Sequence, residues 1–262
     1  MDPEEEERKK KELQKELLFE RRVLFACTCM VGLAAVLWVA AISTNYWFVV
    51  DGGAKGIYVN ATRRFFLMSH SGLWRICRKS MFLGVPAPGR QPVDSSTVTV
   101  IGNVTLHTNC KNHEMFPTDQ KLKMDPSLDK TILNYSRTEV SFAIISLLLM
   151  FMGLIFSVYT FRNPRYMFKR LAGGIHFLAC ASVLAVIEVL INSVDYERKN
   201  LPFVFPAGAT HRWGYSIVLA WLVFILLLVA GAAFMLFSRK RKGSRAPTEE
   251  IAMADEPTII GR

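Results

Sequence analysis

The chain has 262 residues, of which 51% are hydrophobic and 21% are charged, and its formal net charge is +10. So apolar a composition excludes an ordinary soluble domain, because the hydrophobic residues must be concentrated in particular segments. A basic excess often suggests nucleic-acid binding, but here it flanks the ends of the apolar segments. It therefore indicates membrane topology and contact with the lipid bilayer, and no nucleic-acid partner is expected.

Four apolar runs are long enough to cross the roughly 30 Å hydrocarbon core of a bilayer. They occupy residues 23–43, 140–161, 171–194 and 213–238. Backbone polar groups in lipid must pair within their own segment, so each run is expected to be a helix. The first run is longer than the core of a signal peptide and follows a charged leader, which argues against cleavage.

The distribution of Lys and Arg predicts the orientation of these spans. Basic residues crowd the start of the first span, the junction after the second and the segment after the fourth. Since such residues are retained in the cytosol, both termini are predicted to be cytosolic in a multi-pass plasma-membrane protein. Residues 1–22 are then a cytosolic helix, and residues 162–170 are a cytosolic loop. Residues 44–139 and 195–212 are the two exterior loops, and residues 239–262 are a disordered cytosolic tail.

The loop at 44–139 is the one sizeable exterior segment, and turn signals divide it into strand-like stretches. We expect a small extracellular antiparallel β-sheet on a membrane α-helical, four-helix bundle. A further strand is predicted in the second exterior loop. The expected strands are Tyr46–Val50, Ile57–Asn60, Gly72–Ile76, Thr97–Ile101 and Leu201–Phe205.

Two of the five cysteines, Cys77 and Cys110, fall in the long exterior loop, whereas the others lie within spans. Disulfides persist outside the cell, so we expect a Cys77–Cys110 bond. Closing a loop of about thirty residues is worth roughly 3–4 kcal/mol in chain-entropy models.

Three Asn-x-Ser/Thr sequons all fall in the same loop. They predict glycosylation there, because the acceptor pattern is used on exterior segments. The predicted sites are Asn60, Asn103 and Asn134, of which Asn134 lies nearest the membrane.

The sequence contains no arrangement typical of an active site: no metal-spaced histidine pair, nucleophile elbow or phosphate-binding loop. An enzyme is therefore not expected, and neither is a metal, a cofactor or a small-molecule substrate.

Glu188 is an acidic residue inside the third span, where an ionisable group is costly. It shares a helical stripe with small residues, which let helices approach closely, and with Asn192. We expect Glu188 to form a hydrogen bond within the bundle; the alternative is that Glu188 and Asn192 contact a polar or basic residue in a partner's span. The small residues on this stripe are Gly174, Ala181 and Ala185, and the second span has a comparable stripe of Ser146, Gly153 and Ser157.

The exterior loop contains the motif His70-Ser-Gly-Leu-Trp-Arg-Ile-Cys77. Gly72, Leu73, Trp74 and Cys77, placed after the first of four spans, resemble the claudin-like tetraspan superfamily. With Asn109-Cys110 and Glu188-Val189, the chain is most similar to voltage-gated calcium channel gamma subunits, either the skeletal-muscle-type branch or a divergent relative. Trp74 is expected to be structural, packing where the sheet meets the bundle.

The resemblance implies an accessory subunit that binds the pore-forming calcium channel subunit through its spans and modulates gating. The second and third spans would face the channel's voltage-sensing helices. One alternative is an auxiliary subunit of AMPA-type glutamate receptors, although the chain lacks the apolar C-terminal anchor of those regulators. Another is a claudin-like or peripheral-myelin-like adhesion protein, although claudins space their paired cysteines more closely.

Overall fold

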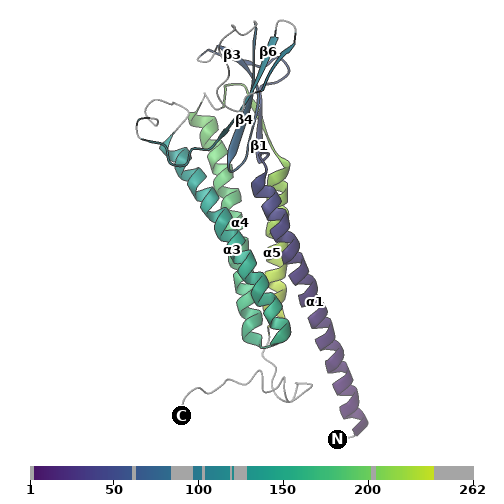
Figure 1. The fold of residues 1–262 in the computed structure, drawn as a ribbon. Helices are drawn as coiled ribbons and strands as arrows, with labels where there is room; N and C mark the ends of the chain where they lie inside the picture. The colour runs from purple at the N-terminus through teal and green to yellow at the C-terminus, as the bar shows by residue number, and fades with distance from the viewer. Residues whose placement is uncertain are drawn as a thin grey trace. The chain divides into compact units, whose positions relative to one another are not determined.

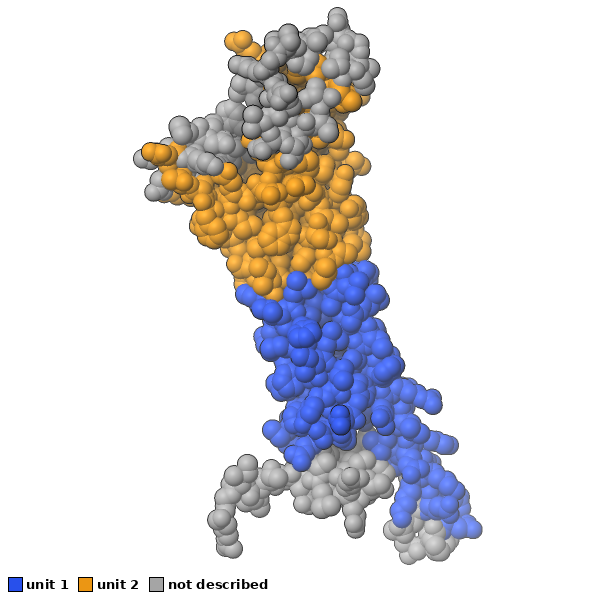
Figure 2. Space-filling model, in the orientation of Figure 1, with its two compact units in different colours: residues 1–37, 145–183, 222–262 blue, residues 38–144, 184–221 orange. Residues whose placement is uncertain are grey.

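The computed structural model describes residues 3–60, 63–83, 97–101, 104–118, 120, 129–201 and 205–238. The predicted tail at 239–262 and the sequon at Asn103 lie outside the described residues. The chain divides into two compact units, which Figure 2 colours separately. Unit 1 comprises residues 1–37, 145–183 and 222–262, and unit 2 comprises residues 38–144 and 184–221.

Four long helices dominate the described chain (Figure 1). Each contains a stretch long and apolar enough to cross a membrane, which confirms the prediction of a multi-pass protein with four spanning helices. The four helices are α1 (Pro3–Ser43), α3 (Lys130–Arg162), α4 (Tyr166–Asn200) and α5 (Tyr215–Leu236). Helices α1, α3 and α4 extend beyond the apolar runs that predicted them, and α5 lies within its predicted run.

Unit 1 consists of helical segments that pack through small and apolar side chains. Large apolar residues on the outer faces, such as Phe25, Leu148 and Ile155, remain about half exposed or more, as a lipid environment requires. A buried ion pair joins α1 to α4, with Lys169 Nζ 2.6 Å from Glu20 Oε1. The fully buried residues of this unit include Val31, Ala34, Met150, Ala172, Ala179, Val183, Leu227, Ala230 and Phe234.

Unit 2 combines the remaining helix ends with an antiparallel sheet. The described strands follow the order β5-β6-β4-β3-β1-β7, and β2 pairs separately with β3. The longest pairing joins β4 to β6, in continuous register from Arg75 opposite Asn112 to Leu83 opposite Val104. The strands are β1 (Phe48–Asp51), β2 (Ile57–Val59), β3 (Arg64–Ser71), β4 (Arg75–Leu83), β5 (Thr97–Ile101), β6 (Val104–Asn112) and β7 (Thr210–Trp213).

The antiparallel sheet is confirmed, but one of the predicted strands is wrong. Gly72–Ile76 is not one strand, because the chain turns between β3 and β4 at Gly72. In the shorter loop the structure describes a strand, β7, at Thr210–Trp213, with Trp213 opposite Phe48 of β1. Residues 202–204 are outside the described part of the chain, so the strand predicted at Leu201–Phe205 stays a prediction.

Strands β3 and β6 were not predicted. Strand β3 includes Arg64 and a run of apolar residues without alternation. Strand β6 does alternate, with Val104, Leu106 and Cys110 at every second position, but Thr108 interrupts its apolar face. Their pairing with β4 on either side supplies the backbone hydrogen bonds that the sequence pattern does not reveal.

Candidate functional site

Residues 71–75 form the turn between β3 and β4, and we call them the motif turn. The Gly72 amide donates to the Arg75 carbonyl over 2.9 Å, and the Trp47 amide donates to the Ser71 carbonyl over 2.9 Å. A Cβ atom at Gly72 would collide with the carbonyl oxygen of Thr44. Glycine is therefore required here because another segment of backbone passes against the turn.

Two tryptophan indoles donate hydrogen bonds to carbonyls at the C-terminal end of helix α1. The Trp74 indole donates to the Ile42 carbonyl over 2.8 Å, and the Trp47 indole donates to the Ala41 carbonyl over 2.9 Å. The last carbonyls of a helix have no partner within the helix, so these indoles satisfy them. Leu73 is 1% exposed, and the motif therefore attaches the sheet to the end of α1, in agreement with the structural role expected for Trp74.

His113, the residue that follows β6, stabilises the motif turn. This residue was not identified from the sequence. Its Nε2 atom donates to the Gly72 carbonyl over 3.2 Å and lies 3.3 Å from Ser71 Oγ. Its backbone amide donates to the Trp74 carbonyl over 2.8 Å. Burial lowers the pKa of His113 from its ordinary value of 6.5, although the hydrogen bond to Gly72 opposes that shift. His113 is three residues after Cys110, but that spacing alone does not identify it as a partner of the turn.

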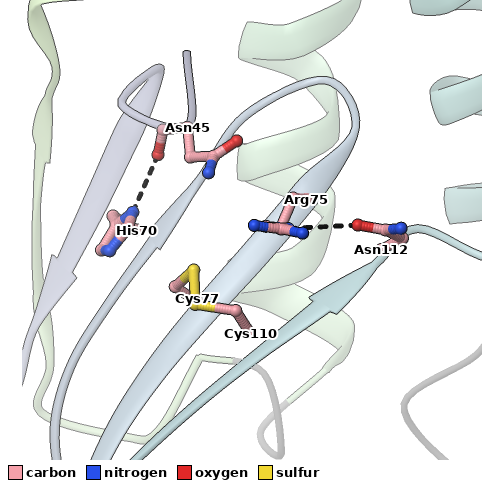
Figure 3. Close-up of a disulfide and its surroundings, with 6 residues drawn as sticks. All are labelled: Asn45, His70, Arg75, Cys77, Cys110 and Asn112. Carbon is pink, nitrogen blue, oxygen red and sulfur yellow. Dashed lines mark hydrogen bonds between the residues drawn. A yellow bond between two sulfur atoms is a disulfide. The ribbon is translucent and has the colours of Figure 1, made fainter. Parts of the chain in front are cut away.

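The disulfide joins Cys77 and Cys110, which lie directly opposite each other on β4 and β6 (Figure 3). Its Cα atoms are 4.0 Å apart. On β3, His70 lies opposite Cys77, donates from Nδ1 to the Asn45 carbonyl over 3.0 Å and stacks on Tyr46. The expected disulfide is confirmed, and it links β4 to β6 two residues after the motif turn.

Helix α3 presents its stripe of small residues to the interior of unit 1. Ser157 is fully buried and forms a 2.8 Å hydrogen bond with His176 Nε2 of α4, which is also fully buried. A Cβ atom at Gly153 would lie 2.7 Å from the His176 ring. The small side chains of α3 therefore make room for His176.

Helix α4 presents its own stripe outward. Both Glu188 and Asn192 are exposed, and Asn192 Nδ2 donates to the Glu188 backbone carbonyl over 2.8 Å. No side chain among the described residues pairs with the Glu188 carboxylate. A Cβ atom at Gly174 would meet open space. The expectation that Glu188 turns into the bundle is therefore wrong, because the helix directs this stripe away from its neighbours.

Two of the three sequons can be located. Asn60 is exposed in the turn that follows β2, and Asn134 is exposed on the first turns of α3. Their glycosylation stays a prediction. Within the described residues, no group of three or more His, Cys, Asp and Glu side chains is placed to hold a metal ion.

These features define a class: a four-span helical membrane protein with a disulfide-linked sheet and a Gly-Leu-Trp turn that completes the first span. The chain belongs to the family described as PMP-22/EMP/MP20/Claudin tight junction, whose model matches residues 32–236. The claudin-like resemblance drawn from the motif is thereby confirmed.

Particular relatives are voltage-dependent calcium channel gamma subunits. The chain is 29% identical to the gamma-1 subunit of Sus scrofa over 223 residues, which cover 84% of this chain and 89% of the relative. It is 26% identical to the gamma-7 subunit of Homo sapiens over 222 residues, which cover 84% and 72%. It is also 26% identical to the gamma-5 subunit of Homo sapiens over 215 residues, which cover 81% and 67%.

Proposed function

We propose that this protein is a gamma-type accessory subunit of a voltage-gated calcium channel. It binds the pore-forming subunit in the plasma membrane and modulates gating. The names of its relatives support this, since the similarity covers most of the chain. Both termini lie in the cytosol in this proposal, and the sheet lies outside the cell. Asn60, Asn103 and Asn134 are then glycosylation sites.

The observation that carries the proposal is the exposure of Glu188 on α4. A carboxylate facing lipid is costly, so ionisable residues in spans usually face protein or water. A partner's span with a basic or polar side chain opposite Glu188 removes that cost. Asn192 lies one turn away on the same face and offers a second polar contact.

The small residues along the same face explain how a partner helix approaches. Ala181 is exposed, Ala185 is half-buried and Gly174 has open space around it. Small side chains allow helix backbones to pack closely in membranes, where the hydrophobic effect does not drive helices together. This face of α4 therefore combines close packing with one charged contact.

The mechanism is a bias on the voltage-sensor equilibrium. A sensor helix moves its basic residues between two states, and a fixed carboxylate on α4 contacts them differently in each state. A ligand shifts a conformational equilibrium only by its differential affinity for the states. Coupling of about 1–3 kcal/mol is typical, so we expect a shift in the voltage dependence of inactivation.

The experiment is co-expression with a calcium channel, comparing the wild-type protein with Glu188→Gln. The wild-type protein should co-purify with the pore-forming subunit and shift inactivation, and the variant should lose most of the shift. The control is Ile225→Ala on α5, which removes an exposed apolar side chain from another helix. Absence of both co-purification and a gating shift in the wild type rejects the proposal.

The same cells separate the alternatives. Slower desensitisation of a co-expressed AMPA-type receptor identifies a glutamate-receptor auxiliary subunit. Accumulation of the protein at cell contacts, with no effect on either channel, identifies an adhesion protein.

A further inference from the structure

Unit 2 contains one buried and two half-buried charged side chains that neither the motif turn nor the outer face of α4 uses. Glu139 on α3 is 6% exposed. It lies on the inward face of the helix, one turn before the fully buried Ala143. Glu197 near the end of α4 and Arg78 in β4 complete the group. Three separate elements therefore bring charges together in one place.

The charges of the two carboxylates oppose each other. Glu139 and Glu197 repel each other electrostatically, and Arg78 attracts Glu197. Glu139 Oε1 and Glu197 Oε2 are both buried and have no hydrogen-bond partner among the described residues.

Neighbouring contacts keep α3 and α4 together at this level. The Tyr135 and Tyr196 rings meet at 6.1 Å, and the Tyr196 hydroxyl donates to Asp129 Oδ2 over 2.6 Å. Asp129 is thereby paired already. From β6, the neutral Asn109 lies opposite Arg78. Arg78 is the cation that attracts Glu197 in this group.

Two like charges held close in a low-dielectric interior are strongly unfavourable, and such pairs commonly keep one proton between them. A proton on one carboxyl removes this repulsion. It also turns an unpaired acceptor oxygen into a hydroxyl, which can donate a hydrogen bond to the other carboxylate. The step is the binding of one proton from water, with no other bond made or broken.

We propose that Glu139 and Glu197 form a proton-binding site and share one exchangeable proton at neutral pH. When the proton is lost, the two carboxylates repel each other and weaken the packing of α3 against α4. Proton binding therefore stabilises this packing, and with the sheet outside the cell, as proposed above, the packing weakens on extracellular alkalinisation. The site does not depend on which partner the protein binds.

The test is infrared difference spectroscopy of the purified full-length protein, titrated from neutral to alkaline pH. Wild-type protein should show a protonated-carboxyl band at neutral pH that disappears on alkalinisation. Glu139→Gln should lose this band, and Glu197→Gln serves as the second variant if the first does not fold. A wild-type spectrum without the band, or a band that survives in both variants, overturns the proposal.

Arg78 supplies a second test with a matched control on the same strand. Arg78→Met removes the attracting cation, so the pH midpoint of the band should rise by about 1–3 units. Arg75→Met removes an exposed arginine whose Nε bonds Asn112 (Figure 3) and should leave the midpoint unchanged. Equal shifts in both variants, or loss of the band on addition of Ca²⁺ at constant pH, contradict a proton site.

Discussion

The four helices contribute segments to both compact units, but different interactions stabilise the interior of each unit. In unit 1 the helices pack through small and apolar residues, with the Ser157–His176 hydrogen bond as a buried polar contact. In unit 2 the indoles of Trp47 and Trp74 donate to the last carbonyls of α1, and a disulfide links β4 to β6. Helices in lipid gain little from burying apolar surface, so close approach stabilises them. A small sheet has little hydrophobic core of its own, so covalent and polar contacts support it.

The stripes of small residues extend the comparison to single helices. Both stripes have helical spacing, yet the stripe on α3 receives His176 and the stripe on α4 faces outward. The first packs inside unit 1, and we propose that the second is available for a partner. The following predictions test this division, from the largest expected effect to the smallest.

Replacing Cys77 and Cys110 with serine should destabilise the sheet by about 3–4 kcal/mol, because the closed loop restricts the unfolded chain. The measurement is thermal unfolding in detergent, followed by protease sensitivity of the sheet. Cys29→Ser removes an exposed, free thiol and serves as the control. If both proteins unfold at the same temperature, the disulfide does not support unit 2 as described.

Gly153→Ala should cost about 1–3 kcal/mol through overpacking, because the added methyl group would press on the His176 ring. Gly174→Ala adds the same group in open space on α4 and should be neutral or slightly stabilising. Both are measured as changes in the free energy of unfolding or in the melting temperature. Equal effects would mean that the two stripes do not differ in their surroundings.

Trp74→Phe should cost about 1–2 kcal/mol, because it leaves the Ile42 carbonyl without its indole donor. Trp213→Phe is the matched control, since its indole nitrogen has no hydrogen-bond partner among the described residues. A larger loss in the control would place the support of unit 2 in β7 instead of the motif turn.

His113 predicts a smaller, pH-dependent effect. Burial lowers its pKa in the folded protein, so the unfolded chain binds a proton more readily. Its contribution to stability is complete above pH 6.5 and decreases as the pH falls below that value. The expected loss is at most about 1.4 kcal/mol per unit of pKa shift. His113→Gln should reduce this acid sensitivity, as measured by melting temperature against pH; an unchanged profile would exclude His113 as its source.

Much of the fold could be predicted because membrane constraints act on local sequence. A span must be apolar along its whole length, so composition reveals all four helices. The disulfide was predictable because only Cys77 and Cys110 lie in the long loop. Strands β3 and β6 were missed, because β3 lacks alternation and the alternation of β6 is interrupted at Thr108, so their pairing with β4 decides both.

The sequence by itself determined the number of spans, the cysteine pair and the motif that marks the family. Tertiary structure alone decided which way each stripe faces, which carbonyls the tryptophans satisfy and where the charges of Glu139, Glu197 and Arg78 meet. The physical reason is that helical periodicity places residues on a common face, whereas the direction of that face depends on packing against segments distant in the chain.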